Sequence, residues 1–184
     1  MGRSMFFSHN NTRSAGVCIL FQKGIDAHVH NSISDPNGRY IILDLTIYNH
    51  RLSLVTLYAP NLEEPMFFQD IFTKVATVSN CSLLLCGDWN TVQDYYLDNF
   101  NIKHHRNQKC RDKIDEFKNS LELLDPWRLC NPDVRKYTWR QPNPLRQSRL
   151  DYFLATEDLF SLMKTTDIIP ALKSQKKKKN LLKL

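Results

Sequence analysis

The stretch Leu83-Leu84-Leu85-Cys86-Gly87-Asp88-Trp89-Asn90 (LLLCGDWN) decides the fold expected for this chain. The apolar run at 82–86 predicts a buried strand. Gly87 lets the backbone turn, and Asp88 and Asn90 follow at the strand end, where α/β proteins commonly keep their functional side chains. In extended backbone these two side chains point the same way. A turn that uses the same polar groups for its own hydrogen bonds is the structural alternative.

Strands and helices alternate on both sides of this stretch. Upstream, Pro65–Val78 has the apolar spacing of a helix and follows a predicted antiparallel meander. Downstream, the apolar stripe of Lys109–Leu124 predicts a second helix that Asp125-Pro126 ends. Further elements are expected as strands at Ala15–Phe21, Ile25–Ile33, Tyr40–Ile47, Leu52–Tyr58, Lys136–Arg140, Arg149–Ala155 and Ile168–Ile169, and as a short helix at Thr156–Lys164. The order predicts an α/β sandwich rather than a doubly wound parallel sheet.

Length and charge suggest one domain with a basic tail. The chain has 184 residues and a formal net charge of +6, and six lysines with no acid lie within 173–184. The remaining residues are balanced, so we expect a domain over 1–172 and a basic, disordered tail over 173–184. No apolar run has the length of a membrane span and no signal-peptide pattern is present. We therefore expect an intracellular protein without a membrane partner, in a compartment (nucleus or cytoplasm) that the sequence does not name, and with an oligomeric state that it does not indicate.

Three more segments carry residues suited to chemistry. Asp151 lies inside a predicted strand in Ser148–Phe153 (SRLDYF), where a carboxylate is disfavoured unless it has a partner or a role. Arg149 would share its strand face, so an Arg149–Asp151 ion pair is the structural alternative. Tyr58 ends a strand before a proline turn, and Thr138 lies between two aromatic residues. Each of these last two is weak evidence alone, because aromatic residues more often serve packing.

The sequence assigns no residue to a metal site. The five cysteines form no CxxC pair, which argues against zinc. His28 and His30 would share a strand face, but two ligands do not make a site. The basic stretch Lys103–Lys113 can touch DNA, although a solvated helix start is the simpler interpretation.

Taken together, the motifs are specific. Ser8-His9 before Gly16-Val17, then LYAPN, CGDWN, YTW and SRLDYF in this order, resemble the endonuclease/exonuclease/phosphatase family, and most of all the apurinic-type endonuclease domains of non-LTR retrotransposons. The resemblance runs from about Phe6 to Ser174. It implies a four-layered sandwich of two β-sheets flanked by helices, incomplete here, and Mg²⁺-dependent cleavage of a phosphodiester in DNA.

The resemblance also implies roles for five residues. In the family, the residue matching Asp88 orients or activates the attacking water, and the matches of Asn90 and Tyr58 contact the scissile phosphate. The match of Thr138 lies near the DNA backbone. The match of Asp151 steadies a catalytic histidine. All five positions are kept in this chain.

Two departures from the family pattern predict weak catalysis. The family carries an Asn and the Mg²⁺-holding Glu on strands before the first motifs seen here, and Asp26, Asp35 and Asp44 do not stand in a matching context. The family ends in Ser-Asp-His, whereas Gln175 and Lys176 follow Ser174. A Gln does not accept a proton at neutral pH, and a Lys is normally protonated. We therefore expect little or no activity.

Three functional interpretations follow. The chain is an active Mg²⁺ nuclease completed by another chain, a retrotransposon remnant without enzymatic role, or a nucleic-acid-binding module that uses the retained face and the lysine tail. The wider family's lipid- and inositol-phosphate phosphatases fit the motif context less well.

Overall fold

The chain folds around one mixed five-stranded sheet. The computed structural model describes residues 5–9, 15–78, 82–103, 106–169 and 181–183. The sheet contains β3 (Ala27–Ser34), β4 (Tyr40–Ile47), β5 (His50–Tyr58), β6 (Ser82–Asp88) and β10 (Asp151–Ala155), in the order β10-β6-β5-β4-β3. All neighbours are antiparallel except β5 and β6. That parallel pair needs a crossover connection, and helix α1 (Pro65–Val78) supplies it.

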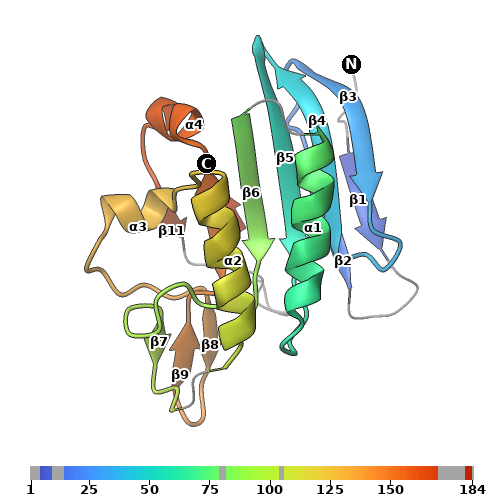
Figure 1. The fold of residues 1–184 in the computed structure, drawn as a ribbon. Helices are drawn as coiled ribbons and strands as arrows, with labels where there is room; N and C mark the ends of the chain where they lie inside the picture. Colours follow the sequence, from blue (N-terminus) through green and yellow to red (C-terminus); the bar gives the residue numbers. More distant parts are fainter. Residues whose placement is uncertain (1–4, 10–14, 79–81, 104–105, 170–180, 184) are drawn as a thin grey trace.

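Two helices cover one face of this sheet. Helices α1 and α2 (Gln108–Ser120) lie side by side in front of the sheet in Figure 1. Their apolar stripes include Phe68, Ile71, Ile114 and Phe117, which pack on inward-facing residues of β5, β6 and β10. This cluster is the larger of two cores and buries the side chains that the sequence placed on the helix stripes.

A two-stranded ribbon covers the other face. Strands β1 (Met5–His9) and β2 (Gly16–Leu20) pair antiparallel and lie behind the sheet in Figure 1. Their inward residues, among them Phe6, Val17 and Ile19, pack on a second apolar cluster over β4. The outward side chains of Met5, Phe7 and Leu20 are exposed. The layers are thus helices, sheet and ribbon.

Smaller elements gather at the end of the sheet where β6 stops. Strands β7 (Asn99–Phe100), β8 (Trp139–Gln141) and β9 (Arg146–Ser148) form a three-stranded sheet in the order β7-β9-β8, seen below α2 in Figure 1. Two short helices, α3 (Pro126–Cys130) and α4 (Glu157–Leu162), flank β10 and β6. Strand β11 (Asp167–Ile169) pairs with β12 (Leu181–Lys183).

The expected α/β sandwich is confirmed, and the bounds of α1 and β4 agree with the sequence prediction. The second helix ends at Ser120 rather than Leu124, because Glu122 has a left-handed φ of 49° and Leu124 forms a bridge with Ala155. The short strand expected at 136–140 begins later, at Trp139. Within the described part of the chain, no helix is both long and apolar enough to span a bilayer.

Candidate functional site

Three predicted site residues form one row across the sheet. In the strand register Tyr58 is the partner of Asp88, and Asp88 is the partner of Asp151. Paired residues on adjacent strands carry their side chains on the same face. The neighbouring Leu57, Gly87 and Tyr152 lie on the helix-covered face, so the row points to the ribbon side.

The two carboxylates of this row lie close together without a counter-ion. No described cation forms an ion pair with Asp88 or Asp151. Burial and then the charge of Asp151 raise the pKa of Asp88 to about 6. Burial also raises the pKa of Asp151, opposed by a hydrogen bond with Thr138. Raised pKa values in a carboxylate pair are typical of sites that transfer protons or bind cations.

Asn90 is held beside Asp88 by the turn that follows β6. Its φ is 47°, a left-handed conformation that Asn adopts more readily than most residues. Its backbone N–H donates to Asp88 Oδ1 at 3.0 Å, and its Nδ2 donates to the carbonyl of Ala59 at 2.7 Å. Both bonds fix the amide next to the carboxylate, at the end of β5 and β6.

Gly87 is required by the close approach of β5 and β6. Its φ is 144°, and a Cβ built there would lie 1.9 Å from the carbonyl oxygen of Leu57. Such a contact is possible for no side chain, so this position admits only glycine. The strand that carries Asp88 therefore approaches the strand that carries Tyr58 at a spacing that a Cβ would prevent.

Trp89 locks the same turn to β10. Its backbone N–H donates to the carbonyl of Leu150 at 2.8 Å, and its Nε1 donates to the carbonyl of Tyr152 at 3.1 Å. The indole is fully buried and stacks on Tyr152 with ring centroids 4.9 Å apart. Trp89 thus has a structural role between Asp88 and Asn90, the two predicted site residues of the DWN sequence.

Thr138 holds the backbone at Asp151 by hydrogen bonds. Its Oγ1 accepts hydrogen bonds from the backbone N–H groups of Leu150 and Asp151, both at 3.0 Å. Tyr58 lies at the opposite end of the row, with the guanidinium carbon of Arg39 5.0 Å from its ring centroid. The structure therefore brings Tyr58, Asp88, Asn90, Thr138 and Asp151 to one end of the sheet.

The predicted alternative of an Arg149–Asp151 pair is wrong. Strand β10 begins at Asp151, so Arg149 lies in the preceding loop and shares no strand face with it. Arg149 is fully buried, and its Nε and Nη2 donate to Asp98 at 2.8 and 3.1 Å. Its Nη2 also donates to Asp125 at 2.7 Å. Asp151 is thereby left without this cation.

Acids near the start of the chain are engaged elsewhere. Asp44 forms an ion pair with Arg51 at 2.8 Å, and Asp35 accepts the backbone N–H of Arg39 at 2.9 Å. Gln175 and Lys176, which depart from the family pattern, lie outside the described residues. Among the described residues no group of three or more His, Cys, Asp and Glu side chains could hold a metal ion.

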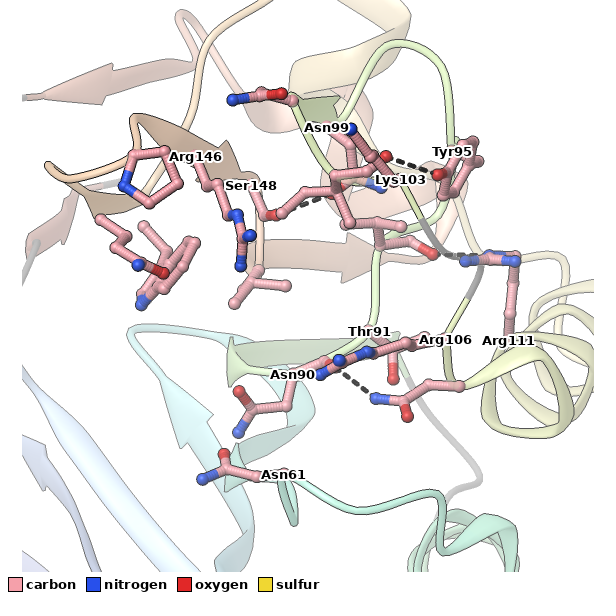
Figure 2. A pocket seen from close by; sticks show the side chains of 18 residues that line it. Asn61, Asn90, Thr91, Tyr95, Asn99, Lys103, Arg106, Arg111, Arg146 and Ser148 are labelled. Carbon is pink, nitrogen blue, oxygen red and sulfur yellow. Dashed lines mark hydrogen bonds between the residues drawn. The ribbon is translucent and has the colours of Figure 1, made fainter.

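A cavity of about 880 Å³ opens beside the row, between α2 and the three-stranded sheet. Asn90 and Leu150, which neighbour the carboxylates, form part of its wall. Four of its described lining residues are basic and none is acidic: Lys103, Arg106, Arg111 and Arg146. Five others are asparagines: Asn61, Asn90, Asn99, Asn101 and Asn107. Figure 2 shows Arg106 and Arg146 on opposite sides of the space.

The sequence analysis missed this cavity and the ion cluster around Arg149. The cavity joins residues from four separate segments, and only the basic stretch 103–113 gave a signal for it. Of that stretch, Lys103, Arg106 and Arg111 line the cavity. The simpler interpretation as a solvated helix start is therefore incomplete.

Comparisons with known proteins identify the family of the chain and support its fold. Residues 2–171 match the model of the Endonuclease/Exonuclease/phosphatase family. An AP endonuclease from Leishmania major superposes with a TM-score of 0.69 at 17% identity, covering 87% of this chain and 63% of that enzyme. An AP endonuclease from Archaeoglobus fulgidus gives 0.67 at 19% identity (87% and 69% covered), and a 3'-5' exonuclease from Neisseria meningitidis gives 0.65 at 18% (91% and 72% covered).

These likenesses establish the fold, since the identities are low. The chain spans under two thirds of the Leishmania enzyme. The family match, in contrast, extends over most of the chain and includes every motif of the site. The chain therefore belongs to the endonuclease/exonuclease/phosphatase family.

Proposed function

We propose that this chain is a DNA-nicking phosphodiesterase domain of the retrotransposon type with little activity of its own. One observation carries the proposal: Tyr58, Asp88 and Asp151 form a single row, with Asn90 fixed beside Asp88. A phosphodiester cut at this row would have a proton acceptor, an amide and a phenol within one small region.

Each residue of the row has a chemical task in this proposal. Asp88, with a pKa of about 6, is mostly ionised at neutral pH and suited to take a proton from an attacking water. Asn90 donates one amide hydrogen to the carbonyl of Ala59, and its second amide hydrogen is available to a phosphate oxygen. Tyr58 offers a hydroxyl to the same phosphate, and Thr138 keeps Asp151 in place.

The carboxylates fit part of a Mg²⁺ site. Carboxylate oxygens are ligands that Mg²⁺ prefers, and protein sites often supply only one or two of them. Asp88 and Asp151 are such a pair, and no described cation forms an ion pair with either. A bound Mg²⁺ would stabilise charge on the phosphoryl group.

Low activity follows from the residues that replace the family's acid–base pair. Gln175 and Lys176 stand where the family has Asp-His. A positioned acid–base group contributes roughly 10²–10⁴-fold to a rate. Asp35 and Asp44 are bound to other groups, so neither is free to act as a metal ligand. Slow turnover by the chain alone is the consequence.

The alternative function is nucleic-acid binding without cleavage. The basic, asparagine-rich cavity beside the row favours it, because cations and amides bind phosphate and sugar groups without needing a metal. Binding of DNA with no cutting at any Mg²⁺ concentration would support this alternative.

The test is nicking of supercoiled plasmid in Mg²⁺, with protein shown to be folded by circular dichroism. We expect at most slow nicking, abolished by EDTA and by Asp88→Ala. Asp133→Ala, which changes an exposed aspartate outside the row, is the matched control and should leave the rate unchanged. Fast nicking that Asp88→Ala abolishes would disprove the low-activity part. Nicking that survives Asp88→Ala would disprove the proposed site.

A gain-of-function variant separates a weakened enzyme from a binder. The double change Gln175→Asp and Lys176→His restores the residue types of the family pair. We expect the nicking rate to rise by roughly 10²-fold, the lower end for a positioned acid–base group. Swapping the order, Gln175→His with Lys176→Asp, keeps the composition and should give no gain. If neither variant cuts DNA that both bind, the binding function is favoured.

A further inference from the structure

We propose that the α2 side of the cavity binds a second backbone phosphate of the nucleic acid, with Arg111 as its main ligand. The proposal rests on the proposed function only in taking the ligand to be a nucleic acid. The phosphate meant here is distinct from the one that would lie at Asp88.

Arg111 is buried but incompletely satisfied. It is 8% exposed, and its Nε donates to the carbonyl of Val92 at 2.8 Å while Nη1 donates to Gln108 at 2.6 Å. Its Nη2 is buried and has no hydrogen-bond partner. A buried cationic donor without a partner is costly, and native structures rarely retain one without a reason. Figure 2 shows Arg111 extending from α2 into the cavity wall.

The charge around Arg111 favours an anion. Among the described lining residues there is no acid, while Lys103 and Arg106, which also line the cavity, are exposed. The first turn of α2 carries no acidic residue, and its cap Asn107 makes no side-chain hydrogen bond to the helix end. The helix N-terminus adds a partial positive charge. Glu63 already accepts the backbone N–H of Lys109 at this end of the helix. Arg111, and not the helix N-terminus, is therefore the principal donor.

Asn107 connects this phosphate subsite to Asn90, which lies beside the row of Tyr58, Asp88 and Asp151. Its Nδ2 donates to the carbonyl of Asn90 at 2.8 Å, and its own carbonyl accepts the backbone N–H of Arg111 at 3.0 Å. Arg111 and Asn90 are therefore held in one hydrogen-bonded frame. A strand with one phosphate at Asn90 can continue into the cavity and place another at Arg111.

The experiment measures binding of a fluorescein-labelled 16-base-pair DNA duplex by anisotropy, in EDTA so that no cleavage occurs, over a range of NaCl concentrations. We expect Arg111→Gln to weaken binding about tenfold and to reduce the slope of log K against log salt by about 0.9, the value for one phosphate contact. If Arg111→Gln does not fold, Arg111→Lys takes its place in the experiment. Lysine keeps the charge but lacks the planar guanidinium, so we expect a smaller loss of affinity.

Two double variants of exposed residues complete the design. Lys103→Ala with Arg106→Ala should weaken binding and lower the slope by about 1.8. Lys23→Ala with Lys164→Ala removes the same charge from exposed positions outside the cavity and should change the affinity much less. Equal losses in the two pairs would mean a general charge effect and would overturn the subsite.

The outcomes also separate this inference from the proposed function. Unchanged DNA affinity in folded Arg111→Gln overturns the subsite, even if the wild-type protein nicks plasmid. A loss confined to the cavity variants supports the subsite, even if no variant ever nicks DNA. Absence of measurable binding by the wild-type chain overturns it as well.

Discussion

Two pairs of aspartates, one buried and one half-buried, lie at the same end of this molecule and behave in opposite ways. Asp98 and Asp125 share the guanidinium of Arg149, and Asp98 also pairs with Arg128 at 2.6 Å. Asp88 and Asp151 face each other across two strands with no described cation between them. Burial raises the pKa of a carboxyl in both places, but hydrogen bonds and charge from Arg149 reverse this for Asp98, whose pKa is lowered. For Asp88 nothing reverses it.

The difference separates carboxylates that the protein neutralises from carboxylates that have no described counter-ion. The Arg149 cluster (Arg149, Asp98 and Asp125) connects the loop after β6, the cap of α3 and the residues before β10. The ring centroids of Trp127 and Tyr152 each lie 5.2 Å from the guanidinium carbon of Arg149. The charges of this cluster are neutralised within the protein. The Asp88–Asp151 pair keeps its charge unmatched, and the fold tolerates this because the rest of that region is held by Trp89, Thr138 and the Arg149 cluster.

The largest expected effect comes from breaking the neutralised pair. Arg149→Met leaves Asp98 and Asp125 buried without their main counter-ion, and we expect a loss of about 3–5 kcal/mol in the free energy of unfolding. Urea unfolding followed by tryptophan fluorescence measures it. Lys113→Met, which removes a half-exposed helical pair with Glu116, is the control and should cost less than about 1 kcal/mol. Losses of similar size in the two variants would contradict the assigned role of Arg149.

A second prediction concerns pH and compares the two pairs directly. The folded pKa of Asp88, about 6, lies above the ordinary value, so the folded state binds a proton more tightly than the unfolded state between about pH 4 and 6. Its contribution to stability is therefore present at pH 4 and lost as the pH rises to 6, by on the order of 2 kcal/mol. Asp98 has a lowered pKa, and its contribution is instead lost as the pH falls below 4.

Urea midpoints from pH 3 to 8 test this sign. Asp88→Asn should flatten the decline between pH 4 and 6 and make the protein more stable at pH 7. Asp133→Asn, an exposed site, should reproduce the wild-type curve. If stability declines between pH 4 and 6 in Asp88→Asn as it does in the wild type, Asp88 is not the carboxyl whose raised pKa causes the decline.

The smallest effect on stability is expected at Thr138, which binds the backbone beside Asp151. Thr138→Val removes the acceptor for the N–H groups of Leu150 and Asp151. We expect a loss of about 1 kcal/mol, at the lower end for unsatisfied donors because water can reach the half-buried Asp151. Thr138→Ser keeps the oxygen and should retain most of the stability. A Ser variant as weak as the Val variant would instead point to packing of the methyl group.

Much of the fold followed from local sequence patterns. Pro65–Val78 shows a helical apolar period because one face of α1 is buried, and Tyr40–Ile47 is an almost unbroken apolar run because β4 is buried on both faces. The bounds of both elements agree with the prediction. Strands β7 and β9 were not predicted. They have two and three residues, too few to show a period, and they form because of their pairing with each other.

The site shows the same difference between residues marked by a local motif and residues brought together only by the tertiary fold. Positions marked by a local motif, Asp88 and Asn90 above all, gather where a strand end was predicted. The alternative of an Arg149–Asp151 pair is wrong because the partners of Arg149, Asp98 and Asp125, lie 51 and 24 residues away and only the tertiary fold brings them near. Asp151, two residues away, was the closer choice in sequence and the wrong one in space.

The contact between Gly87 and Leu57 has a consequence for engineering. Libraries that randomise the residues around Asp88 should find position 87 closed even to alanine, since a single methyl group would force β5 and β6 apart. Activity could be tuned through Cys86, Trp89 or the cavity wall, but every surviving clone would carry glycine at 87. The spacing of two strands, and not the chemistry of any side chain, would thus limit how far this site can evolve.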